Sequence, residues 1–555
     1  MAATPGRVEA GATGAFAPLR ESIFRRIWSA SLFSNFGQMI LNVGAAWEMT
    51  RLSDSPSMVA LVQTAMLVPL MLVALPAGAL ADMFDRRKIA LFGLGFSIAS
   101  SSVLTAIALM GLATPWLLLF FCVLIGTGVA LYNPSWQASI SEQVSLERLP
   151  AAVALGSISN NVARSFGPAL GGLIVVALGA KAAFATNACF YLPLWLSFFI
   201  WQRKHVPSRL PPERIDRAIQ SGLRYARHSP PIRTMMARAF FFGLASASST
   251  ALAPLVAKEL LKGDAAVFGI LLGATGVGAV LGAFCVGELR ERFSTEAMVR
   301  VCSIASAICL IVTGMSRSLP LTCVALFVSG CCSTLIFATL NLVVQLSAPR
   351  WVTARALSLY SSALTGGVAF GAWGWGVVAT YNGVAFAFFA SSFAVVATVA
   401  LGWLLPLPSS EENNDLVELE QVPDTGMALT MRSGPVVIEV EYDVDPERAR
   451  EFYEVMTKIE RIRKRIGGFD WSISRDIISP EIWVEHYHCP TWGDYLRMRD
   501  RYSQADSAMV QQAESFNRSH DRRRVKRRLE RPFGSVRWKA DSPDTYQDAV
   551  GYIAP

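Results

Sequence analysis

Long apolar segments constrain this chain more than any other feature of its sequence. The hydrocarbon core of a bilayer is about 30 Å thick, so a helix that crosses it needs about 20 apolar residues at ~1.5 Å each. We predict such spans at 27–50, 57–81, 88–111, 114–140, 150–178, 181–202, 234–260, 265–287, 297–316, 319–347, 352–379 and 381–405. The predicted fold class is therefore an all-α membrane bundle of 12 transmembrane helices with a small domain after it.

Composition and charge agree with a membrane location for most of the chain. Hydrophobic residues make up 52% of the 555 residues and charged residues 17%, against roughly 25% in ordinary soluble proteins. Residues 1–410 hold 28 Lys and Arg and 15 Asp and Glu, which gives a net charge of +13. Residues 411–555 hold 22 Lys and Arg and 27 Asp and Glu, which gives a net charge of −5. The positive excess lies between apolar segments, which argues against nucleic-acid binding. A basic run in the tail is interpreted as a solvated face: Arg522, Arg523, Arg524, Lys526, Arg527, Arg528 and Arg531.

The distribution of Lys and Arg between loops predicts which side of the membrane the termini face. With the N-terminus inside, the inner segments carry 22 of these residues, Arg238 and Arg300 among them, and the outer loops carry five. Positive residues favour the cytoplasmic side. We therefore predict a multi-pass protein of the inner membrane, with lipid as a partner and both termini in the cytoplasm. In the central loop, Glu213–His228 has the spacing of an amphipathic helix on the inner face.

The predicted organisation has seven segments. They are a cytoplasmic N-terminus (1–26), a first six-helix bundle (27–202), a cytoplasmic central loop (203–233), a second six-helix bundle (234–406), a linker (407–433), a cytoplasmic α+β domain (434–535) and a tail (536–555).

The two bundles are related by an internal repeat. An offset of 204 residues places Phe166 on Phe370, Gly78 on Gly282, Arg86 on Arg290, Lys88 on Arg292 and Gln137 on Asn341. One shared offset in three regions predicts a duplicated six-helix unit. A duplicated unit of this kind would place a substrate path at the interface between the repeats, near the middle of the bilayer.

The loop between the second and third spans carries the most specific motif of the chain. It reads Gly78-Ala79-Leu80-Ala81-Asp82-Met83-Phe84-Asp85-Arg86-Arg87-Lys88. It resembles the loop motif G-x-L-x-D-x-x-x-R-[RK]-[KR] of the major facilitator superfamily of transporters. The resemblance implies a gating role for Gly78, Asp82, Asp85, Arg86, Arg87 and Lys88, which would latch the two bundles together on the cytoplasmic side. The alternative is a loop that only follows the positive-inside rule.

Two further stretches resemble exporters of that superfamily. Leu149–Gly172 is similar to the span-five motif of the exporters, whose small residues and proline lie between the bundles; here these are Gly167, Pro168, Gly171 and Gly172. Trp47–Asp82 and the C-terminal extension are similar to the enterobactin-exporter-like permeases. The resemblance implies proton-coupled efflux of a small molecule, siderophore-like or drug-like, with import as an open alternative. The chain contains no phosphate-binding loop for ATP, and we expect no cofactor.

Polar side chains inside the predicted spans are candidates for the substrate path, because contact with lipid is costly for them. Most lie three or four residues apart and so share a helix face. The candidates are Asn35, Gln38 and Asn42 in span one, Asn133 and Gln137 in span four, Asn160 and Arg164 in span five, and Asn341 and Gln345 in span ten. For each amide, the alternative is a hydrogen bond between two helices, worth about 1 kcal/mol or less.

Arg164 and Glu48 are the charged candidates. A guanidinium halfway through a span must be paired or hydrated. We predict that Arg164 holds an anionic substrate group or takes part in coupling; a static ion pair or a snorkelling side chain is the alternative. Glu48, near the outer end of span one, is the candidate for proton coupling. The alternative is that Glu48 is a solvated residue at a helix end.

The residues after the linker alternate between strand and helix patterns. Strands are predicted at 436–442, 469–477, 481–488 and 522–529, and helices at 446–466 and 491–515. The order β-α-β-β-α-β predicts a ferredoxin-like fold.

This C-terminal domain resembles small dimeric α+β domains that include cofactor-free monooxygenases. His486 and His488 share a strand face, but two histidines without a third ligand are weak support for a metal or haem site, and we assign none. We interpret the domain as a regulatory or dimerising module. The alternative to a transporter is a membrane-anchored sensor or enzyme whose C-terminal domain carries the chemistry.

Overall fold

The computed structural model describes residues 16–83, 85–145, 148–202, 215–349, 352–406, 425–427, 429–499, 501–518 and 524–530. They divide into two compact units. The membrane unit takes its described residues from 1–219, 234–343 and 357–408. The second unit takes its residues from 220–233, 344–356 and 409–555.

The first half of the membrane unit is a series of long helices. After a 3-10 turn, η1 (Ala17–Arg20), come α1 (Ser22–Leu52), α2 (Pro56–Met83), α3 (Arg86–Leu109), α4 (Pro115–Gln143), α5 (Leu149–Leu178) and α6 (Ala180–Ile200). Local signals explain several of the ends: Thr114 accepts a hydrogen bond from the N–H of Leu117 at the start of α4, and Gly179 with φ +81° ends α5. A positive φ favours glycine because other residues clash there.

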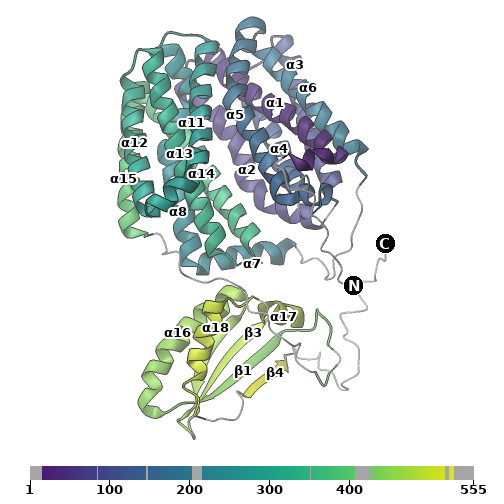
Figure 1. Cartoon of the computed structure of the whole chain (residues 1–555), viewed down its shortest axis with the longest axis vertical. Coiled ribbons are helices and arrows are strands. Elements are labelled where there is room, and N and C mark those ends of the chain that lie inside the picture. The colour runs from purple at the N-terminus through teal and green to yellow at the C-terminus, as the bar shows by residue number, and fades with distance from the viewer. Residues whose placement is uncertain are drawn as a thin grey trace, which may run out of the picture. The chain divides into compact units, whose positions relative to one another are not determined.

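α7 (Ile215–His228) lies in the connection to the second half, which combines long helices with three short helical segments. They are α8 (Pro230–Ser246), α9 (Ser248–Ala251), α10 (Ala253–Leu255), the π-helix η3 (Val256–Leu260), α11 (Ala265–Arg292), α12 (Thr295–Met315), α13 (Leu319–Ser347), α14 (Thr353–Asn382) and α15 (Val384–Leu404). The seventh predicted span, 234–260, is thus a segmented helix. Figure 1 shows the purple and blue helices of the first half and the teal and green helices of the second half as two groups.

The described residues contain ten helices that are long and apolar enough to cross a membrane. α1 and α14, with 31 and 30 residues, are as long but are not among the ten. Both carry more polar residues along their length, as α1 does with Asn35, Gln38 and Asn42. The membrane-spanning character of most of the bundle is confirmed, and the count of twelve spans stays a prediction.

The helix bounds reproduce the internal repeat. Adding 204 to the bounds of α4 (115–143), α5 (149–178) and α6 (180–200) gives 319–347, 353–382 and 384–404, the bounds of α13, α14 and α15. The turn glycine also repeats, because Gly179 plus 204 is Gly383, whose φ is +84°. The second half therefore repeats the local geometry of the first, with one added break in its first span.

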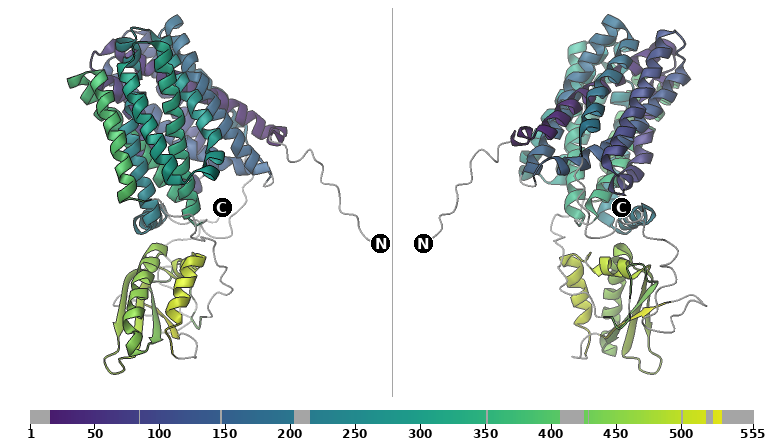
Figure 2. Two further views of the ribbon diagram at one scale, coloured as in Figure 1. Left: turned by 60° about the vertical axis from the view of Figure 1, so that its left-hand side comes forward. Right: turned by 90° about the vertical axis from the view of Figure 1, so that its right-hand side faces the viewer.

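The C-terminal part folds as a four-stranded antiparallel sheet with helices. Its elements are β1 (Val436–Asp443), η4 (Pro446–Arg448), α16 (Ala449–Ile466), β2 (Phe469–Arg475), β3 (Ile482–Cys489), α17 (Trp492–Arg499), α18 (Gln504–Glu514) and β4 (Arg524–Leu529). The strand order is β2-β3-β1-β4, and α16 and α18 cover one face of the sheet (Figure 2). The prediction of one helix over 491–515 is wrong: Ser503 and Asp506 form a capping box that starts a separate helix, α18.

A buried ion pair lies in the core of this domain. The Nε of Arg463 on α16 donates to Glu485 of β3 at 2.7 Å, and both side chains are at most 3% exposed. Trp471 Nε1 and the Tyr442 hydroxyl also donate to the Glu485 carboxylate, at 3.0 and 3.2 Å. Burial alone would lower the pKa of the Arg463 guanidinium, but Glu485 holds that pKa well above its ordinary value. The pair is stable because each charge is matched by its partner and by further hydrogen bonds.

We predict that Glu485→Gln destabilises the C-terminal domain by about 3–5 kcal/mol, because it leaves the buried Arg463 charge without its counter-charge. The measurement is urea unfolding of the full chain followed by tryptophan fluorescence. Glu454→Gln is the control, since the Glu454 side chain is 69% exposed; equal midpoints for both variants would contradict the prediction.

Candidate functional site

The two halves of the membrane unit meet along a first seam between α5 and α11. A Cβ on Gly172 would lie 2.5 Å from the carbonyl oxygen of Ala265, and one on Gly269 would lie 2.6 Å from that of Pro168. A Cβ on Gly276 would lie 2.4 Å from the carbonyl oxygen of Arg164. These separations are shorter than any real contact, so the two backbones approach closely only because glycine has no side chain.

A second seam joins α2 and α14. The Thr64 hydroxyl donates to the carbonyl of Ala369 at 2.8 Å, and the N–H of Ser57 donates to the Thr380 hydroxyl at 3.1 Å. A Cβ on Gly376 would lie 2.6 Å from the Ala60 Cβ. The first seam pairs α5 with the repeat counterpart of α2, and the second pairs α2 with the repeat counterpart of α5. Such an exchange is what a two-fold relation between the halves produces.

The predicted interface residues of α5 divide between two neighbours. Pro168 and Gly172 contact α11 across the seam. Gly167 and Gly171 instead pack against α1 of the same half, where a Cβ would lie 2.6 Å from Met39 Cβ and 3.1 Å from Ile40 Cα respectively. Small residues therefore serve packing within the first bundle as well as between the bundles.

The predicted amides of α1 form contacts with their own bundle. Asn35 Nδ2 donates to the Ser159 hydroxyl of α5 at 3.1 Å, and Gln38 Nε2 donates to Asn42 Oδ1 at 3.0 Å. The hydroxyl of Tyr191, a fully buried residue of α6, donates to Gln38. Sequence reasoning missed Tyr191, although a tyrosine inside an apolar span is a usable signal.

The remaining polar candidates lie on α4, α5 and α13. Gln137 Nε2 donates to Asn133 Oδ1 at 3.2 Å along α4. Asn160 and Arg164 are exposed on α5, and Gln345 is exposed and Asn341 half-buried on α13. In the part of the chain that the structure describes, the Arg164 side chain has no ion-pair partner, and its backbone lies at the first seam. The main chain of Arg164 is therefore at the junction of the two halves.

Glu48 lies near the end of α1 and is paired locally. Its Oε2 accepts a hydrogen bond from Arg51 at 3.3 Å, with the Glu48 side chain 16% exposed. On the opposite half, Lys258 Nζ in the π-helix donates to the carbonyl of Thr50 at 2.6 Å, and Gln63 Nε2 of α2 donates to the Thr250 hydroxyl at 3.0 Å. The broken seventh span thus contacts α1 and α2 where its helical geometry is interrupted.

The loop motif places its arginines against the first bundle. Asp85 caps α3 by accepting a hydrogen bond from the N–H of Arg87 at 3.0 Å. Arg86 donates to Glu142 of α4 at 2.9 Å, and Arg87 donates to the carbonyls at the end of α6. Lys88 is exposed. The surroundings of Gly78 and the side chain of Asp82 lie outside what the structure describes.

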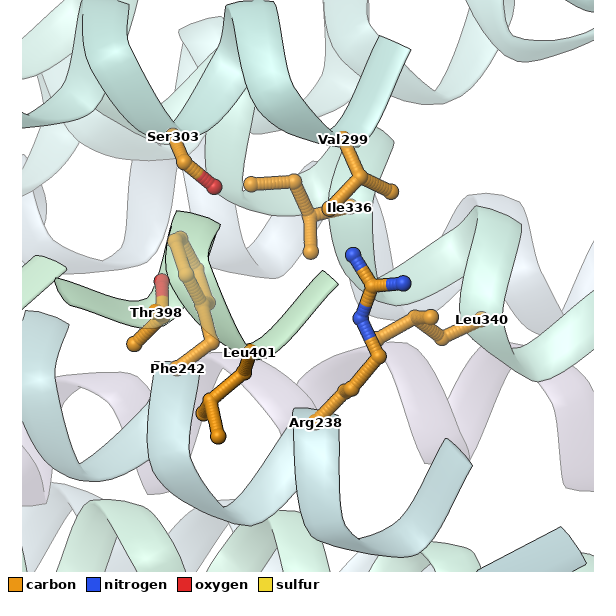
Figure 3. Close-up of a pocket in the computed structure, with 8 residues that line it drawn as sticks. All are labelled: Arg238, Phe242, Val299, Ser303, Ile336, Leu340, Thr398 and Leu401. Carbon is orange, nitrogen blue, oxygen red and sulfur yellow. The ribbon is translucent and has the colours of Figure 1, made fainter. Parts of the chain in front are cut away.

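The second bundle holds an ion cluster that the sequence did not predict. Arg238 of α8 is 4% exposed and donates twice to Glu296 of α12, at 2.6 and 3.1 Å. Arg300 is 3.4 Å from the same carboxylate. Figure 3 shows the Arg238 guanidinium pointing towards Val299 and Ile336 in a small cavity. The sequence pattern indicates Arg238 only as a positive charge of the inner side.

His486 and His488 lie on the sheet face opposite to Glu485. Their ring centroids are 4.8 Å apart, and His488 Nε2 is 3.3 Å from Glu530. Within the described ranges, no group of three or more His, Cys, Asp or Glu side chains could hold a metal ion. The planes of the two rings are 81° apart, so the histidines form an edge-to-face pair on a strand surface.

The comparisons with solved structures place the membrane unit in a known class of fold. The nucleoside transporter NupG matches 70% of this chain and 99% of its own with a TM-score of 0.57 and 11% identity. The D-xylose-proton symporter matches 70% of this chain and 98% of its own, with a TM-score of 0.56 and 13% identity. At such identities the likeness shows the fold alone, which the membrane unit shares with these two transporters.

The family is shown by sequence. Residues 13–533 match the family described as transmembrane secretion effector, and the chain belongs to this family of the major facilitator superfamily. Relatives include the uncharacterized MFS-type transporter YfiS of Bacillus subtilis, 25% identical over 61% of this chain and 82% of its own length. The multidrug efflux pump Tap of Mycolicibacterium fortuitum is 23% identical over 60% of this chain and 83% of its own length. The staphyloferrin A transporter of Staphylococcus aureus is 23% identical over 46% of this chain and 64% of its own length. The protein is thus a membrane transporter, and its family is not one of enzymes.

We predict that Gly276→Ala disrupts the first seam, because its new methyl group overlaps the carbonyl oxygen of Arg164. Overpacking of this kind costs about 1–3 kcal/mol. The measurement is the thermal unfolding midpoint of the purified protein in detergent, which should fall by several degrees. Gly374→Ala is the matched control, since a Cβ there meets nothing within 4 Å; a midpoint of Gly276→Ala equal to that of the control would contradict a close seam.

Proposed function

We propose that this chain is a secondary active exporter that moves a small molecule across the inner membrane by alternating access. The observation that carries the proposal is the reciprocal pair of seams, α5 with α11 and α2 with α14. Two repeated bundles that meet along related seams can rock against each other, with a substrate site between them. The proposed topology has twelve spans and both termini in the cytoplasm, in keeping with the excess of Lys and Arg in the predicted inner segments.

The proposed substrate is a siderophore-like or drug-like small molecule. Two relatives are a staphyloferrin A transporter and a multidrug efflux pump, and these names support small organic substrates and efflux. Proton coupling rests on the resemblance to exporters, and Glu48 is its candidate carboxylate. We propose that the amides of α1, α4, α5 and α13, with Arg164, line the path.

Arg164 is the proposed contact for a negatively charged substrate group. It lies at the junction of the two halves, and guanidinium recognises carboxylates with paired hydrogen bonds. A charged arginine within a membrane unit is energetically costly, and a functional contact would explain why it is there.

We propose that the loop motif acts as a cytoplasmic latch. Its described arginines join α3 to α4 and α6, so the motif holds the first bundle together as one body. The same residues would meet the second bundle when the cytoplasmic side closes, with Asp82 and Gly78 at the contact.

The C-terminal domain is proposed to be a ferredoxin-like regulatory or dimerising module. The strand order β2-β3-β1-β4 with all neighbours antiparallel is the order of that fold. Its core is filled by apolar side chains and the Arg463–Glu485 pair, which supports a structural role for the domain.

We predict that inverted vesicles with an imposed pH gradient accumulate an anionic siderophore-like or drug-like compound, and that Arg164→Ala lowers the initial rate at least tenfold. The physical reason is the loss of a charged hydrogen bond, worth about 1.5–3 kcal/mol. Arg292→Ala is the control, because the Arg292 side chain is 69% exposed and pairs within its own helix. Uptake by Arg164→Ala at the control rate would remove this residue from the path, and wild-type vesicles that accumulate none of a broad compound set would contradict the exporter.

We further predict that Asp82→Asn and Arg86→Ala slow turnover several-fold while membrane insertion stays normal, since each removes a charge from the proposed latch. The measurement is the efflux rate normalised to the amount of protein in the membrane. Arg317→Ala, in an exposed position of the predicted outer side, should transport at the wild-type rate. Wild-type efflux in both motif variants would count against the latch.

A further inference from the structure

One side of α7 is buried within the second compact unit. Gly222, Tyr225, Ala226 and Ser229 are buried, and their spacing of i, i+3, i+4 and i+7 forms one helix face. Tyr225 is 2% exposed, whereas Leu223 on another face is 56% exposed. A tyrosine in a short, polar helix reaches such burial only when another part of the chain covers it.

The cover comes from the C-terminal domain. The guanidinium carbon of Arg465, in the last turn of α16, lies 5.9 Å from the centre of the Tyr225 ring. Arg465 is also paired with Asp506, whose carboxylate caps α18. A cation over an aromatic ring contributes about 0.5–2 kcal/mol. Tyr225 is therefore joined to the ends of two helices of the domain through one arginine.

The neighbouring Arg224 meets the C-terminal end of α16. The N–H groups of Gly467 and Gly468 close that end on the carbonyl of Arg463, and Arg501 donates to the carbonyl of Ile466 at 3.2 Å. An added Cβ on Gly467 would lie 3.5 Å from Nη2 of Arg224. The C-terminal end of a helix carries partial negative charge and favours cations. The positive φ of Gly467, +136°, keeps this end open for the approach.

The same face of α7 also contacts the start of α14. A Cβ on Gly222 would lie 3.2 Å from Arg355 Cβ and 3.3 Å from its Cδ. α14 is one continuous helix from this first turn to the second seam, where Gly376 and Thr380 contact α2. α7 is thus held between the C-terminal domain on one side and the first turn of α14 on the other.

We propose that this face of α7 is the docking surface of the C-terminal domain, and that the docked domain braces the first turn of α14 through Gly222. The occupant is the end of α16 with Arg465 and Gly467. A brace on a helix that forms a seam would slow the rocking of the bundles and so lower the transport rate. Only this effect on the transport rate rests on the proposed function.

The test is hydrogen exchange of the full chain in detergent or nanodiscs. Tyr225→Ala should exchange at least tenfold faster than wild type at the amides of α7 and of the first turn of α14, because it removes the docking contact without touching the fold of the C-terminal domain. Arg465→Ala should accelerate the same amides, and the double variant should add little to either. Arg227→Ala and Tyr453→Ala are matched controls on the exposed sides of α7 and α16, and should exchange as wild type does.

Exchange of α7 in Tyr225→Ala at the wild-type rate would overturn the docking surface. Fast exchange of α7 with unchanged exchange of the first turn of α14 would overturn the brace. If the wild-type chain transports no compound, the proposed function fails while these exchange results still decide the inference. If it does transport, Tyr225→Ala should raise the initial rate at least twofold, and an unchanged rate would overturn the rate consequence.

Discussion

Close contact between helix backbones is the constraint on which the membrane unit depends. Lipid supplies no hydrophobic drive between helices, so association requires dispersion contacts and hydrogen bonds at short range. Glycine permits that range where α5 meets α11, because the carbonyls of Pro168 and Arg164 occupy the space of the missing Cβ atoms of Gly269 and Gly276. At the second seam, Gly376 leaves room for the Cβ of Ala60. The two interfaces therefore resemble each other in chemistry as well as in position.

The charges of the membrane unit have two different arrangements. Arg86 with Glu142 and Arg238 with Glu296 join helices inside one bundle, where an unpaired charge would be costly. Arg164 lies instead beside the seam between the bundles. Charges that hold a bundle together keep it rigid, as the proposed rocking of the two bundles requires. The difference in placement is why we propose recognition for Arg164 and packing for Arg238, whereas Arg86 packs within its bundle and is also part of the proposed latch.

The second compact unit combines a stable core with a surface for contact. Glu485 accepts hydrogen bonds from Arg463, Trp471 and Tyr442, so the interior of the domain is satisfied by its own residues. The end of α16 is different, because Arg501 donates to its last carbonyl and Arg224 lies beside Gly467, which ends the helix. A rigid domain with one attractive helix end is suited to hold α7, which lies in the connection between the two bundles.

The features that depend on local pattern follow from the sequence alone. Apolar length predicted the helices and alternation predicted the strands, because these signals act over a few residues. The shared offset of 204 residues predicted the duplication. Which segments meet became known from the packed structure. The capping box at Ser503 divides a predicted helix, Gly167 packs on α1 while Pro168 faces α11, and Arg238 finds Glu296 of another helix. Partners so far apart in the chain are selected by the packing of whole helices, which no short stretch of sequence encodes.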